Sequence, residues 1–185
     1  IKDSNFTICI SVMGDGGAIY VGGQNTTISG ITSNITQVPN GYGGFVYING
    51  INTVINNSDM KISHSGKEGG AIYINGDGSR VIGTNISMTS SDTDGGAVYI
   101  KAIHASVENS NIAMNNASRS GGAIYIDGIY ASVINSTFAN TYARVSPSSY
   151  AETNLGGAIY IKGDYASISG SKLTNSYANR GGIIY

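Results

Sequence analysis

A glycine pair that returns about every 26 residues is the feature that most limits how this chain can fold. Seven pairs recur at this approximate spacing, beginning at Gly16, Gly43, Gly69, Gly95, Gly121, Gly156 and Gly181. Six of them are followed by a phrase of one pattern, of which Ala71-Ile72-Tyr73-Ile74 is an example. A fixed period of this length is typical of repeat proteins, in which each unit buries its apolar face against its neighbours.

Each repeat contains three short runs in which apolar and polar residues alternate, as in β-strands. The first run is the phrase after the glycine pair, the second is centred on a residue such as Val81, and the third on one such as Ile86. Gly or Asn, which tolerate positive φ, ends the second run. Antiparallel hairpins would place successive copies of the repeat in alternating directions, so the identical residues of neighbouring repeats would not lie side by side. The sequence therefore predicts an all-β fold: a right-handed, single-stranded parallel β-helix with three strands per coil and about 6–7 coils.

Alternation also predicts the direction of the side chains. Ile19, Val21 and their equivalents are aliphatic in every repeat, so we expect them inside, together with the columns of Ile28 and Ile86. Ala18 and Tyr20 are then expected to point outward. The single cysteine, Cys9, excludes an internal disulfide and is expected on the outward side of a strand.

Residues 1–185 are expected to form one domain, a segment of a longer repeat protein. The longer spacing between Gly121 and Gly156 predicts a loop insertion at residues 141–155, which contains Arg144, Pro147 and Tyr150. Insertions in solenoids lie on one edge, often the binding edge, so this loop is either a specificity loop or a tolerated surface excursion.

Composition limits the classes of partner. Charged residues are 11% of the chain and the formal net charge is −1, without a basic block. Nucleic acid and anionic membrane surfaces therefore have no electrostatic basis for binding. The sequence contains no apolar run of about 18 residues, so we expect no membrane span in this segment. We also expect no cofactor.

The glycine-pair phrases resemble the Gly-Gly-Ala-[Ile/Leu/Val] motif of the polymorphic outer-membrane-protein repeat, and look closest to adhesin-like surface proteins of methanogenic archaea. Four phrases fit the motif in full, beginning at Gly69, Gly95, Gly121 and Gly156. The companion motif Phe-x-x-Asn is absent, and Phe138-Ala139-Asn140 has the wrong spacing. The resemblance implies a secreted β-helical protein of the cell surface, used for attachment or envelope structure, and it implies no catalytic residues.

A tyrosine recurs in every phrase and forms the most distinctive candidate site. The column comprises Tyr20, Tyr47, Tyr73, Tyr99, Tyr125, Tyr160 and Tyr185. An outward column would form an aromatic ladder that stacks on sugar rings or packs against another rod. The column is also explained by the β-propensity of tyrosine and by favourable stacking between strands. The small Ala two residues earlier would leave the strip open, which favours the contact role.

Seven Asn-x-Ser/Thr sequons are candidates for glycosylation in a secreted protein, although the abundance of Asn, Ser and Thr alone accounts for several. They are Asn5, Asn25, Asn34, Asn56, Asn85, Asn116 and Asn135.

Ionisable residues give little support to catalysis. Glu68 and Asp94 precede glycine pairs one coil apart, a separation suited to acid–base chemistry or Ca²⁺, but the sequence has no accompanying Asp-Asp pair or basic cluster. His64 and His104 fall in different turns, so no metal pair is expected. The column of Asn75, Lys101, Asp127 and Lys162 is interpreted as a surface ion-pair ladder.

The sequence thus predicts a non-enzymatic, adhesin-like or structural module of the cell surface or envelope, with glycans or another cell surface as partners. One alternative is a self-assembling subunit of an extracellular filament or sheath, associating through the ends of the solenoid or the tyrosine face. A second alternative is a carbohydrate-active β-helix enzyme.

Overall fold

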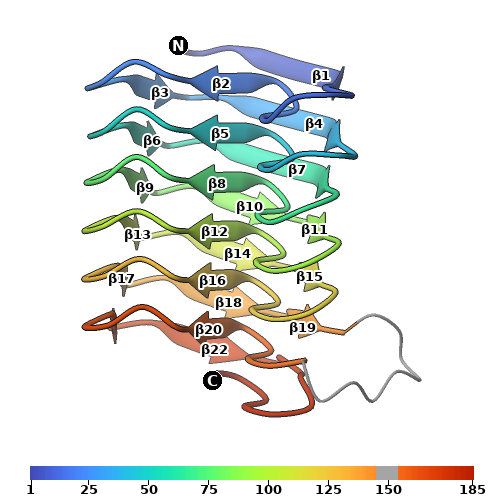
Figure 1. The fold of residues 1–185 in the computed structure, drawn as a ribbon, viewed down its shortest axis with the longest axis vertical. Helices are drawn as coiled ribbons and strands as arrows, with labels where there is room; N and C mark the ends of the chain where they lie inside the picture. Colours follow the sequence, from blue (N-terminus) through green and yellow to red (C-terminus); the bar gives the residue numbers. More distant parts are fainter. Residues whose placement is uncertain (145–153) are drawn as a thin grey trace.

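The computed structural model describes residues 1–144 and 154–185, and these residues form a parallel β-helix without any α-helix. As the chain descends from the N- to the C-terminus, it runs leftward along the front sheet and rightward behind it (Figure 1). This sense of winding is right-handed, as the sequence predicts. About five turns of the coil separate the first strand of the front sheet from the last.

The front sheet contains the strands that follow the glycine pairs. Its order is β2 (Ile19–Val21), β5 (Val46–Ile48), β8 (Ile72–Ile74), β12 (Val98–Ile100), β16 (Ile124–Ile126) and β20 (Ile159–Ile161). A second sheet contains β3 (Thr27–Ser29), β6 (Val54–Asn56), β9 (Arg80–Ile82), β13 (Ser106–Glu108), β17 (Ser132–Ile134) and β21 (Ser167–Ser169).

The third sheet changes along the rod. It begins with three long strands, β1 (Asn5–Ile10), β4 (Thr32–Val38) and β7 (Asp59–Ser65). It continues with shorter ones: β10 (Asn85–Ser87), β14 (Asn111–Ala113), β18 (Thr137–Ala139) and β22 (Lys172–Thr174), with β11 (Ser90–Ser91), β15 (Asn116–Ala117) and β19 (Tyr142–Ala143) beside them. Each long strand bends at a residue of positive φ, such as Ile62 in β7. In later coils the residue at the equivalent position, such as Met88, also has positive φ and separates two shorter strands.

Every strand pairs in parallel with its own copy in the next coil, so sequence repeats become columns. Tyr73 lies opposite Tyr99, and Tyr99 opposite Tyr125. The expected inward columns are confirmed, because Ile72, Val81 and Ile86 are fully buried in one continuous apolar core. Each such side chain contributes about 1.5–3 kcal/mol relative to exposure.

The structure explains why the repeat needs two glycines. The first, Gly69, has φ of +73°, a conformation that L side chains rarely adopt. The second, Gly70, has no room for a side chain: a Cβ atom there would lie 2.0 Å from the carbonyl oxygen of Gly96 in the next coil. The motif therefore follows from a turn and from a close approach between coils.

Two predicted directions are wrong. Ala71 is fully buried, and so are its equivalents Ala97, Ala123 and Ala158. The reason is a bend in the chain: the carbonyl of Ala97 accepts hydrogen bonds from both Ala71 N–H (2.8 Å) and Ile72 N–H (3.0 Å), so strand alternation begins only at Ile72.

Cys9 is also on the opposite side from the one expected. It pairs with Thr36, whose side chain is fully buried, and it therefore belongs to an inward column. Ile8 has φ of +53°, and this bend shifts the alternation of the strand by one residue. Cys9 itself is half-buried.

Candidate functional site

The tyrosine column forms as a continuous stack on the outer face of the front sheet. Successive rings from Tyr20 to Tyr185 lie 4.6–5.5 Å apart, with interplanar angles of 23° or less. Tyr20, at one end, is 58% exposed, whereas Tyr73, Tyr99 and Tyr125 are only 6–9% exposed. The rings cover one another's faces, so the strip is not open in the way that the alanine column suggested.

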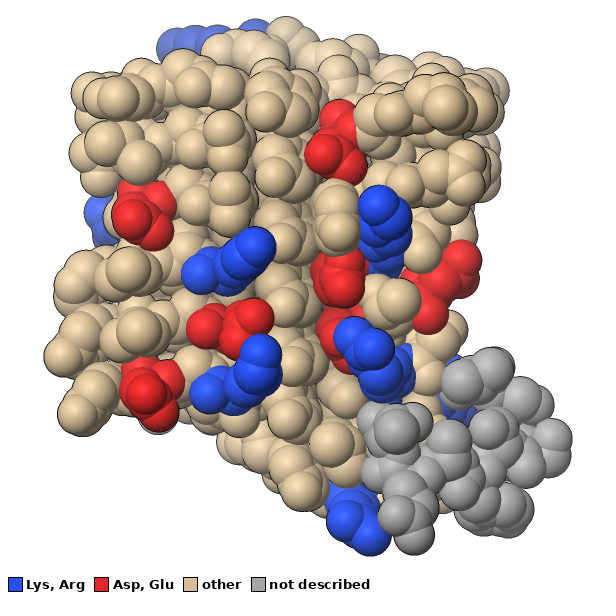
Figure 2. All heavy atoms as spheres, in the orientation of Figure 1, with Lys and Arg blue, Asp and Glu red and all other residues tan. Residues whose placement is uncertain are grey.

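Charged side chains border this stack on both sides. Figure 2 shows two bands of charge on the front face with an uncharged band between them. On one side Lys162 Nζ lies 2.9 Å from Asp127 Oδ1, a contact that agrees with the predicted ion-pair ladder, and Tyr99 Oη donates a hydrogen bond to Asp127 Oδ2 (3.2 Å). Burial, followed by the charge of Asp127, raises the pKa of the Tyr99 phenol. The Tyr99 phenol therefore stays neutral and donates its proton to the Asp127 carboxylate in a hydrogen bond.

Asp94, on the other side of the stack, joins two neighbouring coils. Asp94 is 2% exposed, pairs with the guanidinium of Arg119, and accepts a hydrogen bond from the Ser120 N–H (3.0 Å). Burial raises the pKa of the neighbouring Glu68 carboxyl, with Asp94 adding to the effect. Asp94 is thus engaged with partners in the next coil, which does not favour a role in acid–base chemistry.

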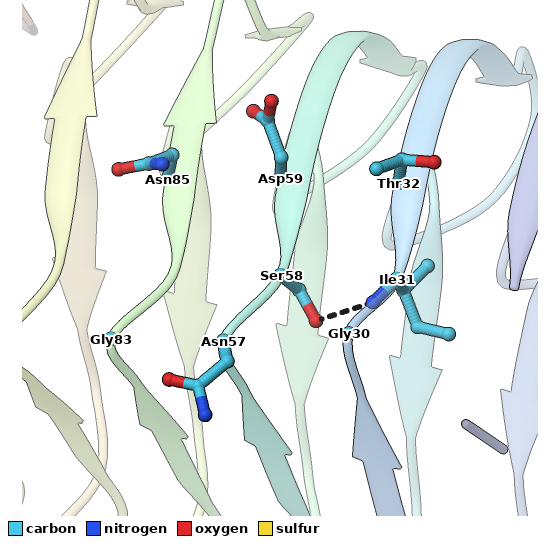
Figure 3. Close-up of a pocket in the computed structure, with 8 residues that line it drawn as sticks. All are labelled: Gly30, Ile31, Thr32, Asn57, Ser58, Asp59, Gly83 and Asn85. Carbon is cyan, nitrogen blue, oxygen red and sulfur yellow. Dashed lines mark hydrogen bonds between the residues drawn. The ribbon is translucent and has the colours of Figure 1, made fainter. Parts of the chain in front are cut away.

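An open hollow of about 330 Å³ lies where the second strands turn into the third. Figure 3 shows its lining residues: Gly30, Ile31, Thr32, Asn57, Ser58, Asp59, Gly83 and Asn85. Ser58 Oγ accepts a hydrogen bond from the Ile31 N–H (3.2 Å) and ties two coils together. Asp59 is the one ionisable residue of this lining, so the hollow does not present the carboxylate pair typical of glycoside hydrolysis.

The histidines and the cysteine do not converge. His64 lies in β7, where Nδ1 is 3.0 Å from Ser90 Oγ, whereas His104 lies in a turn and stacks on Tyr130. In the described part of the chain, no group of three or more His, Cys, Asp or Glu side chains is arranged to hold a metal ion.

A second aromatic column, which the sequence analysis missed, is far more exposed than the first. His104, Tyr130 and Tyr165 stack 4.9 and 5.0 Å apart at the turn after the front sheet, and we call them the turn ladder. Tyr130 is 49% and Tyr165 75% exposed. All three have positive φ, a conformation that Asn25 and Asn52 adopt at the same turn in earlier coils. The sequence could have indicated this column, because its three residues occupy equivalent positions in successive repeats, shortly after the strand that follows each glycine pair.

The remaining candidates are dispersed over the surface. Five sequon asparagines are exposed, namely Asn5, Asn25, Asn34, Asn85 and Asn135, whereas Asn56 and Asn116 are half-buried. In the insertion, Arg144 places its guanidinium 4.4 Å from the ring centroid of Tyr142. Pro147 and Tyr150 lie outside the described residues.

One ion pair on the second sheet gives a pH-dependent prediction. Arg80 donates two hydrogen bonds to Glu108 (2.9 and 2.7 Å), and the pair lowers the pKa of Glu108. Because the pKa of Glu108 is lower in the folded chain than in the unfolded chain, the ionised carboxylate stabilises the fold at neutral pH. This stabilisation is lost as the pH falls through the pKa that Glu108 has in the folded chain. We expect Glu108→Gln to reduce the free energy of unfolding by about 1 kcal/mol at pH 7, and this difference should shrink as the pH falls below the ordinary glutamate pKa of 4.5. Urea titrations of the unaltered chain and of Glu108→Gln at several pH values measure this difference in the free energy of unfolding, with Asp164→Asn as a control. A difference that did not change with pH would contradict the prediction.

Comparison with known proteins gives no relative: no family model, curated protein or solved structure matches this chain. The described residues also contain no helix long and apolar enough to span a membrane.

Proposed function

We propose that this chain is a module of an extracellular cell-surface or envelope protein, acting as an adhesin-like or structural rod rather than as an enzyme. The observation that carries the proposal is the turn ladder. Its rings are exposed at turn tips, where Asn or Gly serves in other coils, and holding a large side chain at positive φ costs about 1–3 kcal/mol per residue. Exposed aromatic side chains with polar ends suit contact with glycans or another surface.

The arrangement of ionisable groups supports a non-catalytic role. Asp94 binds Arg119 and a backbone N–H, and Asp15 accepts a hydrogen bond from the Tyr42 N–H (3.0 Å). These carboxylates thereby join neighbouring coils. Along the described part of the rod, side chains of the same kind recur from coil to coil, and such a surface suits an extended polymeric partner.

Binding to immobilised neutral and acidic polysaccharides tests the proposal. We expect the double variant Tyr130→Asn and Tyr165→Asn to bind at least about tenfold more weakly, equivalent to 1.4 kcal/mol. Its stability should not fall, because Asn tolerates the turn conformation. Tyr20→Asn is the matched control, since Tyr20 is also exposed but lies outside the turn ladder. Equal binding by all three proteins would reject the ladder as the contact, and polysaccharide cleavage abolished by Glu68→Gln would reject the non-enzymatic role.

A further inference from the structure

A continuous column of apolar side chains runs along the corner where the third sheet bends. It consists of Ile8, Ile35, Ile62, Met88 and Met114, one from each of five successive coils, and we call it the corner ridge. Ile8, Ile62, Met88 and Met114 are 64%, 43%, 45% and 52% exposed, and Ile35 is half-buried. A row of adjacent exposed apolar side chains marks an interaction site more often than scattered ones do.

The backbone of the corner ridge is strained. All five residues have φ between 53° and 60°, which for a β-branched residue such as Ile35 is a genuine outlier. Each such residue costs about 1–3 kcal/mol. In the next two coils the same position holds Asn140 and Asn175, with φ of 54° and 50°. The fold therefore accepts Asn at this corner, and the apolar residues are not there because the turn requires them.

The columns beside the corner ridge are nearly free of charge. One flank contains Thr7, Asn34, Lys61, Ser87 and Ala113, and the other Ile10, Gln37, His64, Ser90 and Asn116. Lys61 Nζ lies 2.7 Å from Asp59 Oδ2, so its charge is paired. Few charges and exposed methionines are typical of the centre of a protein interface. An anionic membrane would instead be met by unpaired basic residues.

We propose that the corner ridge is the contact surface between two copies of this chain. A column with one apolar side chain per coil is complementary to itself: under a two-fold axis perpendicular to the column, side chains of one copy fit between those of the other. Such an interface closes on itself and gives a dimer. It uses neither the ends of the solenoid nor the tyrosine face, and it is independent of ligand binding by the turn ladder.

Sedimentation of the 185-residue chain over a wide concentration range tests the proposal. We expect a monomer–dimer equilibrium for the unaltered chain. The triple variant Ile35→Asn, Ile62→Asn and Met88→Asn should dissociate at least tenfold more readily. Its unfolding midpoint, measured at a concentration where both proteins are monomeric, should be equal or higher, because Asn relieves the strain. Ile129→Asn, which removes an exposed isoleucine from another turn, should leave the dimer unchanged.

The reverse change provides a second measurement if the triple variant folds poorly. Asn140→Met lengthens the corner ridge by one coil, so it should tighten the dimer while lowering the monomer's unfolding midpoint. The proposal is overturned by a chain that stays monomeric at every concentration, or by a dimer that neither set of changes alters. Flotation of a monomeric chain with phosphatidylcholine vesicles, abolished by the triple variant, would overturn it in favour of a lipid surface.

Discussion

Replacing Gly70 by alanine is expected to lower the free energy of unfolding by about 3 kcal/mol or more. A Cβ atom on Gly70 would lie 2.0 Å from the Gly96 carbonyl oxygen and 2.7 Å from the Ser90 carbonyl oxygen. Both are backbone atoms held in neighbouring positions of the coil, so neither can rotate away as the end of a side chain could. Relief requires that two coils separate, which breaks the parallel hydrogen bonds and opens the core between them.

Urea or thermal unfolding followed by circular dichroism measures this effect, and the chain contains a matched control. Gly182 occupies the same position in the last glycine pair, and a Cβ atom there would meet nothing within 4 Å. We expect Gly182→Ala to change the free energy of unfolding by less than about 0.5 kcal/mol. Equal effects of the two substitutions would mean that the glycine pair is needed for its turn alone.

The periodicity predicted the fold because a solenoid converts sequence spacing directly into spatial neighbours. Aliphatic residues at equivalent positions, such as Ile72 and Val98, had to stack once the strands were parallel and in register. The same reasoning placed the tyrosines in one column. Strand direction, register and the inward columns were all accessible from the sequence, since each depends only on the repeat and on alternation.

The corners of the coil could not be predicted in this way. Alternation holds only inside a strand, so it failed at Ala71, where the chain bends, and at Cys9, which follows a residue of positive φ. Propensity argues against positive φ for Ile35 or Tyr130, and nothing in their local sequence indicates it. The two exposed columns, the turn ladder and the corner ridge, lie at such corners. The sequence therefore led to the tyrosine column, whose central members are buried, and missed these two exposed columns.

Tyr99→Ala is expected to destabilise the chain by about 3 kcal/mol, as much as the loss of a core aromatic residue. The Tyr99 ring lies 5.1 Å from that of Tyr73 and 4.9 Å from that of Tyr125, and only 9% of the residue is exposed. The substitution removes two stacking contacts, each worth about 0.5–1.5 kcal/mol, together with the burial of the ring. It also leaves a gap in the middle of the column, into which the neighbouring coils cannot collapse because their backbones are fixed by the sheet.

Two further variants show how much of this effect comes from the stacked ring, how much from its hydroxyl group, and how much from the ring's place in the middle of the column. Tyr99→Phe retains the ring and loses only the hydrogen bond to Asp127, so we expect a cost of about 1 kcal/mol or less. Tyr20→Ala removes an end ring that has one neighbour in the column and is 58% exposed, and we also expect about 1 kcal/mol. Chemical unfolding of the three proteins gives the comparison. If Tyr99→Ala cost no more than Tyr20→Ala, the buried stack would contribute little to stability, and the tyrosine column would again need a role in binding to explain why every repeat contains it.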